Sequence, residues 1–121
     1  MPQKLTILVV DDNEEFCQNV KDVLELQDYQ VTTARDGFQA LLTVKQREFD
    51  LVLMDLRMPV MDGVETFKIM KEMSPNTSVI MVTAFIGDDL NKEALKAGAR
   101  DVLGKPLDFD KLLALIRQVI A

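Results

Sequence analysis

A regular alternation of short apolar runs with amphipathic segments constrains this chain most. Three runs, residues 5–10, 50–54 and 78–82, are rich in Val, Ile and Leu and too short for independent helices, which predicts central strands buried on both faces. Residues 29–34 and 100–103 are weaker runs of the same kind and predict edge strands. Apolar residues recur at three- and four-residue spacing between these runs, so we expect strands to alternate with helices five times.

Strict alternation of this kind predicts a parallel sheet with helices on both faces, because parallel neighbours need right-handed crossover connections. The fold class is α/β, doubly wound, and the strand order 2-1-3-4-5 is one of the two common orders. Asp36, Asp62 and Asp108 are expected to cap the second, third and fifth helices, and Gly98 to end the fourth. With 121 residues, the chain is expected to form one domain over residues 1–121.

Composition excludes several classes of function. Fourteen basic and twenty acidic residues give a net charge of −6, which argues against direct nucleic-acid binding by this domain. Histidine is absent, which excludes a Ser-His-Asp triad and an imidazole metal site. The single Cys17 cannot form an internal disulfide, so we expect a half-buried thiol in a reducing, cytoplasmic compartment. No apolar run approaches the roughly 20 residues of a membrane span, and no membrane association is expected.

Chemically useful side chains stand where the predicted strands end. Asp11 and Asp12 follow the first strand, Asp55 the third, Thr83 the fourth and Lys105 the fifth. In the order 2-1-3-4-5 these strands are neighbours, and ligands bind at the carboxyl ends of such sheets. We therefore expect the five side chains to converge.

Three carboxylates at one sheet edge repel each other, so the arrangement is favourable mainly with a cation among them. Oxygen ligands favour Mg²⁺, which keeps coordination positions open for a substrate oxygen. Phosphoryl transfer needs an in-line nucleophile and positive charge on the equatorial oxygens. Asp55, Mg²⁺, Lys105 and the Thr83 hydroxyl can supply these.

Each residue also has an ordinary structural explanation. The Asp or Asn residues after the first strand can cap the next helix, and Asp55 can cap a loop. Thr83 can bond to nearby backbone, and Lys105 can be a solvated surface lysine. Their joint placement at four strand ends favours a site over these separate explanations.

The chain resembles the receiver domains of two-component response regulators. The resemblance covers essentially the whole chain and implies a flavodoxin-like (βα)5 three-layer sandwich. Its most specific part is an Asp-x-x-Met-Pro-x-Met-Asp-Gly run that begins at Asp55. The motifs that carry it are Val10-Asp11-Asp12-Asn13, Leu53 to Gly63, Val82-Thr83-Ala84 and Gly104-Lys105-Pro106.

The resemblance implies a metal site and a phosphoryl site. Asp12 and Asp55 would ligate Mg²⁺ directly, Asp11 mostly through water, and the Arg57 backbone carbonyl would complete the protein ligands. The family also implies that the phosphoryl oxygens are held by Lys105, the Thr83 hydroxyl and the Ala84 backbone N–H. It implies as well that the Lys105-Pro106 peptide bond is cis.

By the same resemblance, Asp55 accepts a phosphoryl group from a phosphohistidine on a sensor histidine kinase or phosphotransfer protein. The domain would catalyse both this transfer and later hydrolysis, acting as a signalling switch rather than a metabolic enzyme. A downstream output domain or target would read the altered surface of the fourth helix and fifth strand. Val102 occupies a position where the family usually has Tyr or Phe, so the active state is expected to be communicated by backbone movement and by Phe85 or Ile86 in the adjoining loop.

Three other functions compete with this interpretation. A haloacid-dehalogenase-type phosphatase would need a second acid at the position of Arg57. A flavin-binding protein of the same sheet order would need a phosphate-cradling loop where this chain has Asp-Asp-Asn-Glu-Glu. A degenerate receiver would dock partners without chemistry, which the complete acidic set argues against. The sequence leaves open whether the chain is a stand-alone regulator or part of a longer protein.

Overall fold

The computed structural model describes residues 4–87 and 89–120. Within these residues five strands alternate with five helices, as expected from the apolar pattern. The elements are β1 (Thr6–Val10), α1 (Glu14–Leu26), β2 (Gln30–Ala34), α2 (Gly37–Gln46), β3 (Leu51–Asp55), α3 (Gly63–Met73), β4 (Ser78–Thr83), α4 (Asp89–Ala97), β5 (Asp101–Gly104) and α5 (Phe109–Val119).

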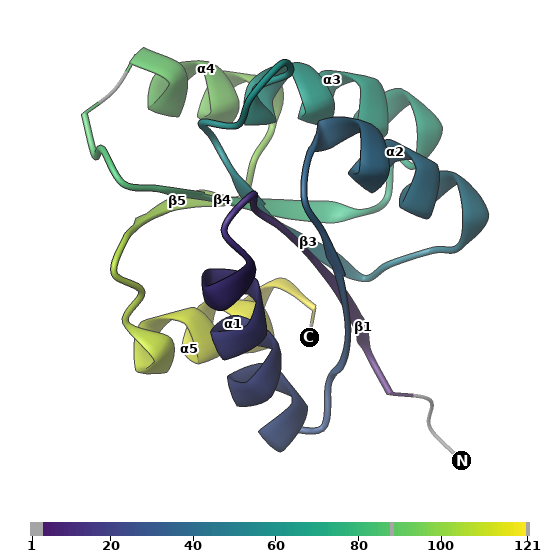
Figure 1. Ribbon diagram of the computed structural model, residues 1–121, viewed down its shortest axis with the longest axis vertical. Coiled ribbons are helices and arrows are strands. Elements are labelled where there is room, and N and C mark those ends of the chain that lie inside the picture. The colour runs from purple at the N-terminus through teal and green to yellow at the C-terminus, as the bar shows by residue number, and fades with distance from the viewer. Residues whose placement is uncertain (1–3, 88, 121) are drawn as a thin grey trace.

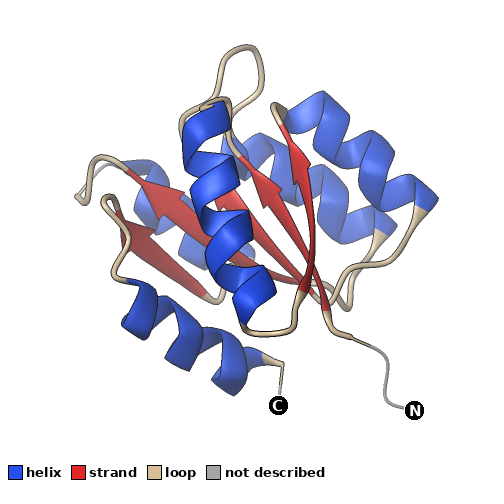
Figure 2. Cartoon of the chain, turned by 60° about the horizontal axis from the view of Figure 1, so that its bottom comes forward, coloured by secondary structure: helices blue, strands red, loops and turns tan. Residues whose placement is uncertain are grey.

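The strands form one parallel sheet in the order β2-β1-β3-β4-β5, which confirms the predicted topology. Helices α2, α3 and α4 cover one face of the sheet, and α1 and α5 cover the other (Figure 1). Figure 2 shows the strands between the two helical layers. Because every strand runs in the same direction, all five carboxyl ends lie along one edge of the sheet.

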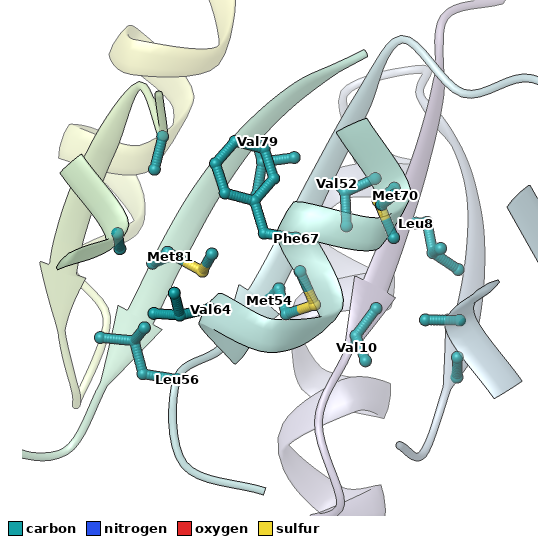
Figure 3. Close-up of a cluster of buried hydrophobic side chains, with 14 of the residues drawn as sticks. Leu8, Val10, Val52, Met54, Leu56, Val64, Phe67, Met70, Val79 and Met81 are labelled. Atoms are coloured by element: carbon teal, nitrogen blue, oxygen red, sulfur yellow. The ribbon is translucent and has the colours of Figure 1, made fainter. Parts of the chain in front are cut away.

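Apolar side chains fill the space on both sides of the sheet. On the face covered by α2, α3 and α4, Phe67 and Met70 from α3 pack over Met54 and Met81 of the central strands (Figure 3). The other cluster joins the sheet to α1 and α5 and includes Leu112, which is fully buried. Burial on both faces explains why the central strands are continuous apolar runs.

Side-chain caps set the start of four helices. Asn13, Asp36, Asp62 and Asp108 each accept a hydrogen bond from the backbone N–H three residues later. The last three were predicted as caps, and Asn13 confirms that the residues after the first strand also serve the next helix. Gly98 has a φ of 114° just after α4, which confirms its role in ending that helix.

Gly63 allows the chain to pass close to the end of β3. A Cβ atom at this position would lie 2.5 Å from the Asp55 carbonyl oxygen and 3.0 Å from the Leu56 Cα. The Gly63 N–H donates to the Leu56 carbonyl at 2.8 Å. The start of α3 is therefore held directly against the backbone that carries Asp55.

Within the described residues, no helix combines the length and apolar character needed to cross a bilayer.

Candidate functional site

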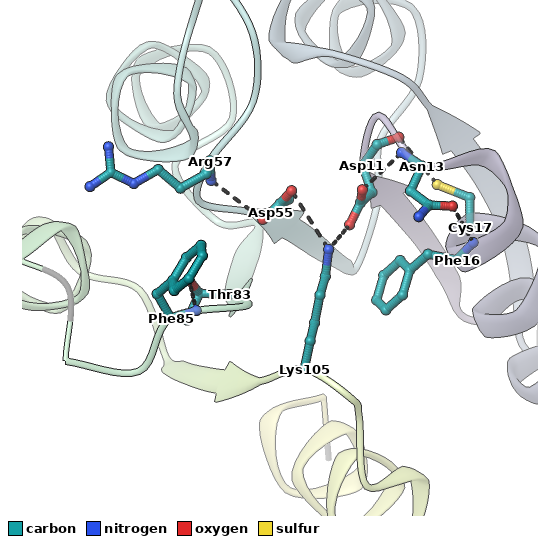
Figure 4. A network of polar contacts seen from close by, with 9 residues as sticks. All are labelled: Asp11, Asn13, Phe16, Cys17, Asp55, Arg57, Thr83, Phe85 and Lys105. Carbon is teal, nitrogen blue, oxygen red and sulfur yellow. Dashed lines mark hydrogen bonds and ion pairs between the residues drawn. The ribbon is translucent and has the colours of Figure 1, made fainter.

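The polar residues predicted to converge come from the ends of adjacent strands. Asp55 pairs with Val82, the residue before Thr83, and Thr83 pairs with Gly104, the residue before Lys105. Asp11 follows directly on Val10, whose partner is Met54. These registers bring the four side chains to one edge of the sheet, although they lie far apart in the sequence (Figure 4).

Three of these side chains are buried, which is unusual for polar groups. Asp11 is 1% exposed, Asp55 7% and Thr83 0%. Burying a carboxylate is costly unless a cation or a hydrogen bond compensates for the lost water. The arrangement therefore requires a partner charge, and Lys105 supplies one.

Lys105 connects the two buried carboxylates. Its Nζ donates to Asp11 Oδ2 at 2.6 Å and lies 3.7 Å from Asp55 Oδ2. Burial alone would lower the pKa of Lys105, but the hydrogen bond to Asp11 and the surrounding acidic charges raise it above its ordinary value. Lys105 therefore carries a full positive charge at neutral pH, and it is not the solvated surface lysine of the alternative explanation.

Asp55 remains in an unfavourable environment despite this cation. Burial, followed by the negative charge of Asp11, raises the pKa of Asp55 to about 6, against the opposing effects of Lys105 and the Arg57 N–H. The Arg57 N–H donates to Asp55 Oδ1 at 3.3 Å, which is a long hydrogen bond. A further positive charge would stabilise the ionised carboxylate.

Asp11, Asp12 and Asp55 are arranged so that one cation could contact all three. Each offers a carboxylate oxygen, and these oxygens lie within 4.8 Å of one another. Asp12 is exposed, while the other two carboxylates form the buried floor of the cluster. A set of hard oxygen ligands with one solvent-facing member fits Mg²⁺, which retains water when protein-bound.

Thr83 lies beside Asp55 and is engaged within its own loop. Its Oγ1 accepts a hydrogen bond from the Phe85 N–H at 3.1 Å. This bond to nearby backbone matches the ordinary structural explanation of Thr83. Ala84, which follows Thr83, is exposed, as are Phe85 and Ile86.

Two contacts with this cluster are not predicted from the sequence. Asn13 donates its N–H to Asp11 Oδ1 at 3.0 Å, and the Phe16 ring lies 4.4 Å from Lys105 Nζ. In the sequence, Phe16 indicates only the apolar face of the first helix. Its place in the first turn of the helix that follows the acidic pair was a signal that it lies near the sheet edge.

Cys17 is more deeply buried than expected, with 6% exposure instead of a half-buried position. Its Sγ donates to the Asp11 backbone carbonyl at 3.4 Å, just behind the acidic cluster. Burial and the charge of Asp11 raise the pKa of the thiol to about 11. The thiol is therefore protonated and unreactive at neutral pH.

The Lys105-Pro106 peptide is cis, as the resemblance implied.

Comparison with known proteins identifies a family. The family model described as the response regulator receiver domain matches residues 7–117. The transcriptional regulatory protein ZraR of Klebsiella oxytoca is 44% identical over 119 residues, which cover 98% of this chain but 27% of the relative. The sporulation initiation phosphotransferase F of Bacillus subtilis is 35% identical over 94% of this chain and 92% of its own length.

Solved structures agree with this assignment. The Vibrio cholerae chemotaxis protein CheY4 superimposes with a TM-score of 0.90 at 31% identity, covering 97% of this chain and 99% of that one. The chain spans little more than a quarter of ZraR but nearly all of the other two proteins. It belongs to the response regulator receiver domain family of two-component signal transduction.

Proposed function

We propose that residues 1–121 act as one receiver domain in which Asp55 accepts a phosphoryl group. The observation that carries the proposal is the position of the Asp55 carboxylate, buried at a sheet edge with two further carboxylates and the Lys105 ammonium. A buried acid in this setting is costly for stability, and a role as a nucleophile is a reason to retain it.

The transfer itself needs little covalent help from the protein. One Asp55 carboxylate oxygen attacks the phosphorus, and the bond between phosphorus and the donor's leaving group breaks as the new O–P bond forms. The leaving group departs with the electron pair of the broken bond. In the later hydrolysis, a water oxygen attacks the phosphorus and the bond between phosphorus and the Asp55 oxygen breaks. The electron pair of that bond restores the carboxylate, and the protons of the water leave with inorganic phosphate or pass to solvent. We propose that the domain itself promotes both steps.

Lys105 is suited to hold a phosphoryl oxygen. An ammonium group has three N–H donors, and the hydrogen bond to Asp11 uses one of them. The 3.7 Å separation from Asp55 Oδ2 is too long for a direct hydrogen bond. A phosphoryl group on Asp55 would therefore find an unused donor on a cation that Asp11 already holds in place. The Thr83 hydroxyl and the Ala84 backbone N–H would hold the other oxygens.

The acidic cluster fits a magnesium ion. Asp12 and Asp55 would ligate it directly, Asp11 would act mostly through water, and the Arg57 backbone carbonyl would complete the protein ligands. When bound, Mg²⁺ would stabilise the negative charge that develops on the phosphoryl oxygens. The raised pKa of Asp55 is consistent with this assignment, since burial and the charge of Asp11 disfavour the ionised carboxylate and a bound cation would offset both.

The switch would begin at Thr83. Its hydroxyl would turn to donate to a phosphoryl oxygen, and because the same oxygen accepts the Phe85 N–H, this turn would move the loop that carries Phe85 and Ile86. Val102 packs against the core between the sheet and α4, where it offers no aromatic ring to swing. We therefore propose that the loop, with its two exposed apolar side chains, transmits the signal.

Amide hydrogen exchange would test this route. Protection in residues 83–87 should change when beryllium fluoride, a phosphoryl mimic, is added with Mg²⁺. Unchanged protection in that segment would contradict it.

The proposed partners follow from the family and from the charge of the chain. The donor would be a phosphohistidine on a sensor histidine kinase or phosphotransfer protein, in the cytoplasm. An output domain or target protein would read the phosphorylated surface. The net charge of −6 makes direct contact with nucleic acid by this domain unfavourable.

Intact mass measurement tests the function directly. Wild-type protein incubated with acetyl phosphate and Mg²⁺ should gain the mass of one phosphoryl group, and the adduct should be labile. Neither Asp55→Asn nor wild type with a chelator should gain it. An adduct that persists in Asp55→Asn would show that another residue accepts the phosphoryl group.

A further inference from the structure

Four residues at the site form a closed ring of contacts. Asp11 uses one carboxylate oxygen for the Asn13 N–H and the other for Lys105 Nζ, at 3.0 and 2.6 Å. Asn13 in turn accepts the Phe16 N–H on its side-chain oxygen at 3.0 Å. The Phe16 ring then lies 4.4 Å from Lys105 Nζ, which closes the ring (Figure 4).

Lys105 needs such support because its side chain is long and partly exposed. The side chain is 22% exposed, and a free lysine side chain has considerable rotamer entropy. Its ammonium must nevertheless stay within reach of both Asp11 and Asp55. The hydrogen bond to Asp11 restrains it on one side, and the Phe16 ring lies against it on another.

The contact with Phe16 is both electrostatic and steric. An ammonium within about 6 Å of an aromatic centroid is attracted by the negative face of the ring. Phe16 is half-buried and packs against the apolar cluster beneath α1 and α5, so its position is fixed by the core. Its backbone is fixed as well, because the Asn13 cap holds the first turn of α1.

We propose that Phe16 is a positioning residue for phosphoryl transfer, which holds the Lys105 ammonium between Asp11 and Asp55 and restricts its access to water. This inference rests on the proposed function, since it requires that Lys105 bind a phosphoryl oxygen. Phe16 touches neither donor nor acceptor and acts through Lys105. Its replacement by an apolar residue without a ring leaves the acidic cluster and Lys105 intact but releases the ammonium.

Phosphorylation kinetics test the role of the ring. With acetyl phosphate and Mg²⁺, Phe16→Leu should form the phosphorylated protein about three- to tenfold more slowly than wild type. Phe16→Tyr, which keeps an aromatic face, should restore most of the rate. Tyr29→Leu is the matched control, because it removes another half-buried ring from the same apolar cluster far from Lys105. It should leave the rate unchanged.

A variant that lacks the Lys105 ammonium separates the positioning of that group by Phe16 from a general packing role of Phe16. In Lys105→Met protein, adding Phe16→Leu should cause no further loss, because the group that Phe16 positions is gone. Urea unfolding of each variant checks that it is folded, and Phe16→Met replaces Phe16→Leu if the latter is not. An unchanged rate in folded Phe16→Leu, or an equal loss in both backgrounds, would overturn the role of Phe16.

NMR gives a readout that does not depend on phosphorylation. The Lys105 side-chain methylene protons should shift in Phe16→Leu through loss of the ring current, and should not shift in Tyr29→Leu. Absence of that shift would overturn the contact itself. If wild type forms no phosphoryl adduct, the proposed function fails and the positioning role fails with it. If wild type is phosphorylated and Phe16→Leu matches it, only the inference about Phe16 fails.

Discussion

The Asp55 side chain combines a functional position with an energetic cost. Its pKa is raised from 3.8 to about 6, so the folded protein binds this proton more tightly than the unfolded chain does. The stability that protonated Asp55 contributes is therefore fully present below the pKa of Asp55 in the unfolded chain. It is lost as the pH rises through about 6, the pKa of Asp55 in the folded protein. At neutral pH, without metal, the ionised carboxylate opposes folding.

Asp55→Asn should consequently stabilise the metal-free protein near pH 8 by about 1–3 kcal/mol, because the uncharged amide avoids the cost of burying a third charge. Near pH 4.5 the gain should shrink to about a third, since wild-type Asp55 is then largely protonated when folded. Urea unfolding in the presence of a chelator measures both values. A gain of equal size at the two pH values would contradict the assignment of the cost to ionisation.

Val60, in the loop after β3, has a strained backbone conformation. It has a φ of 72°, and its side chain is 89% exposed. A β-branched residue in this left-handed region is strained, whereas Asn adopts it more readily. Val60→Asn should raise the free energy of unfolding by about 1 kcal/mol. Urea unfolding with Val60→Ala as the comparison tests this, because Ala removes the branch and should gain less. No gain in Val60→Asn would show that the loop is not strained.

Among the elements, the junction of β3 and α3 has little freedom to change. A Cβ at Gly63 would meet the Asp55 carbonyl oxygen and the Leu56 Cα, both backbone atoms that no rotamer change can move. Gly63→Ala should therefore push the start of α3 away from β3 and lower the free energy of unfolding by about 1–3 kcal/mol. It should also slow phosphorylation, since the strand end that carries Asp55 shifts.

The matched control is Gly98→Ala, which lies before β5, at the opposite end of the strands from Asp55. Its φ of 114° adds strain, but the nearest atom to a Cβ there is the flexible end of Lys71, at 3.1 Å. Urea unfolding and the acetyl phosphate assay measure both variants. Gly98→Ala should lose stability without the loss in phosphorylation rate. An equal effect on the rate in the two variants would argue against a special role for the β3–α3 junction.

The elements were predictable because each is encoded by local patterns. Every strand lies within one residue of its predicted bounds, since strands buried on both faces are necessarily apolar runs. The convergence of Asp11, Asp55 and Lys105 followed from topology alone. The contact of Phe16 with Lys105 did not, because it joins side chains 89 positions apart and depends on their packing. The same is true of the depth at which Cys17 is buried and of the Thr83 contact with Phe85.

For the whole molecule, the distribution of charge links folding stability to the binding of a metal ion. The chain has six more acidic than basic residues, and three of its carboxylates are concentrated in the cluster at the sheet edge. A divalent cation bound there relieves local repulsion and reduces the net negative charge, both of which favour the compact state. Because such a cation binds the folded cluster and not the dispersed acids of the unfolded chain, binding should appear as added stability.

Magnesium should therefore raise the free energy of unfolding of the wild type, by about 1.4 kcal/mol for each tenfold rise in free Mg²⁺ above its dissociation constant. Asp12→Asn should lose most of this dependence, because it removes the solvent-facing carboxylate of the cluster. Asp110→Asn provides the control, since this exposed acid lies in the first turn of α5 and outside the cluster. Its response to Mg²⁺ should match the wild type even if its baseline stability differs. Urea unfolding across a Mg²⁺ series measures all three proteins, and an undiminished response in Asp12→Asn would mean that the stabilising cation binds elsewhere.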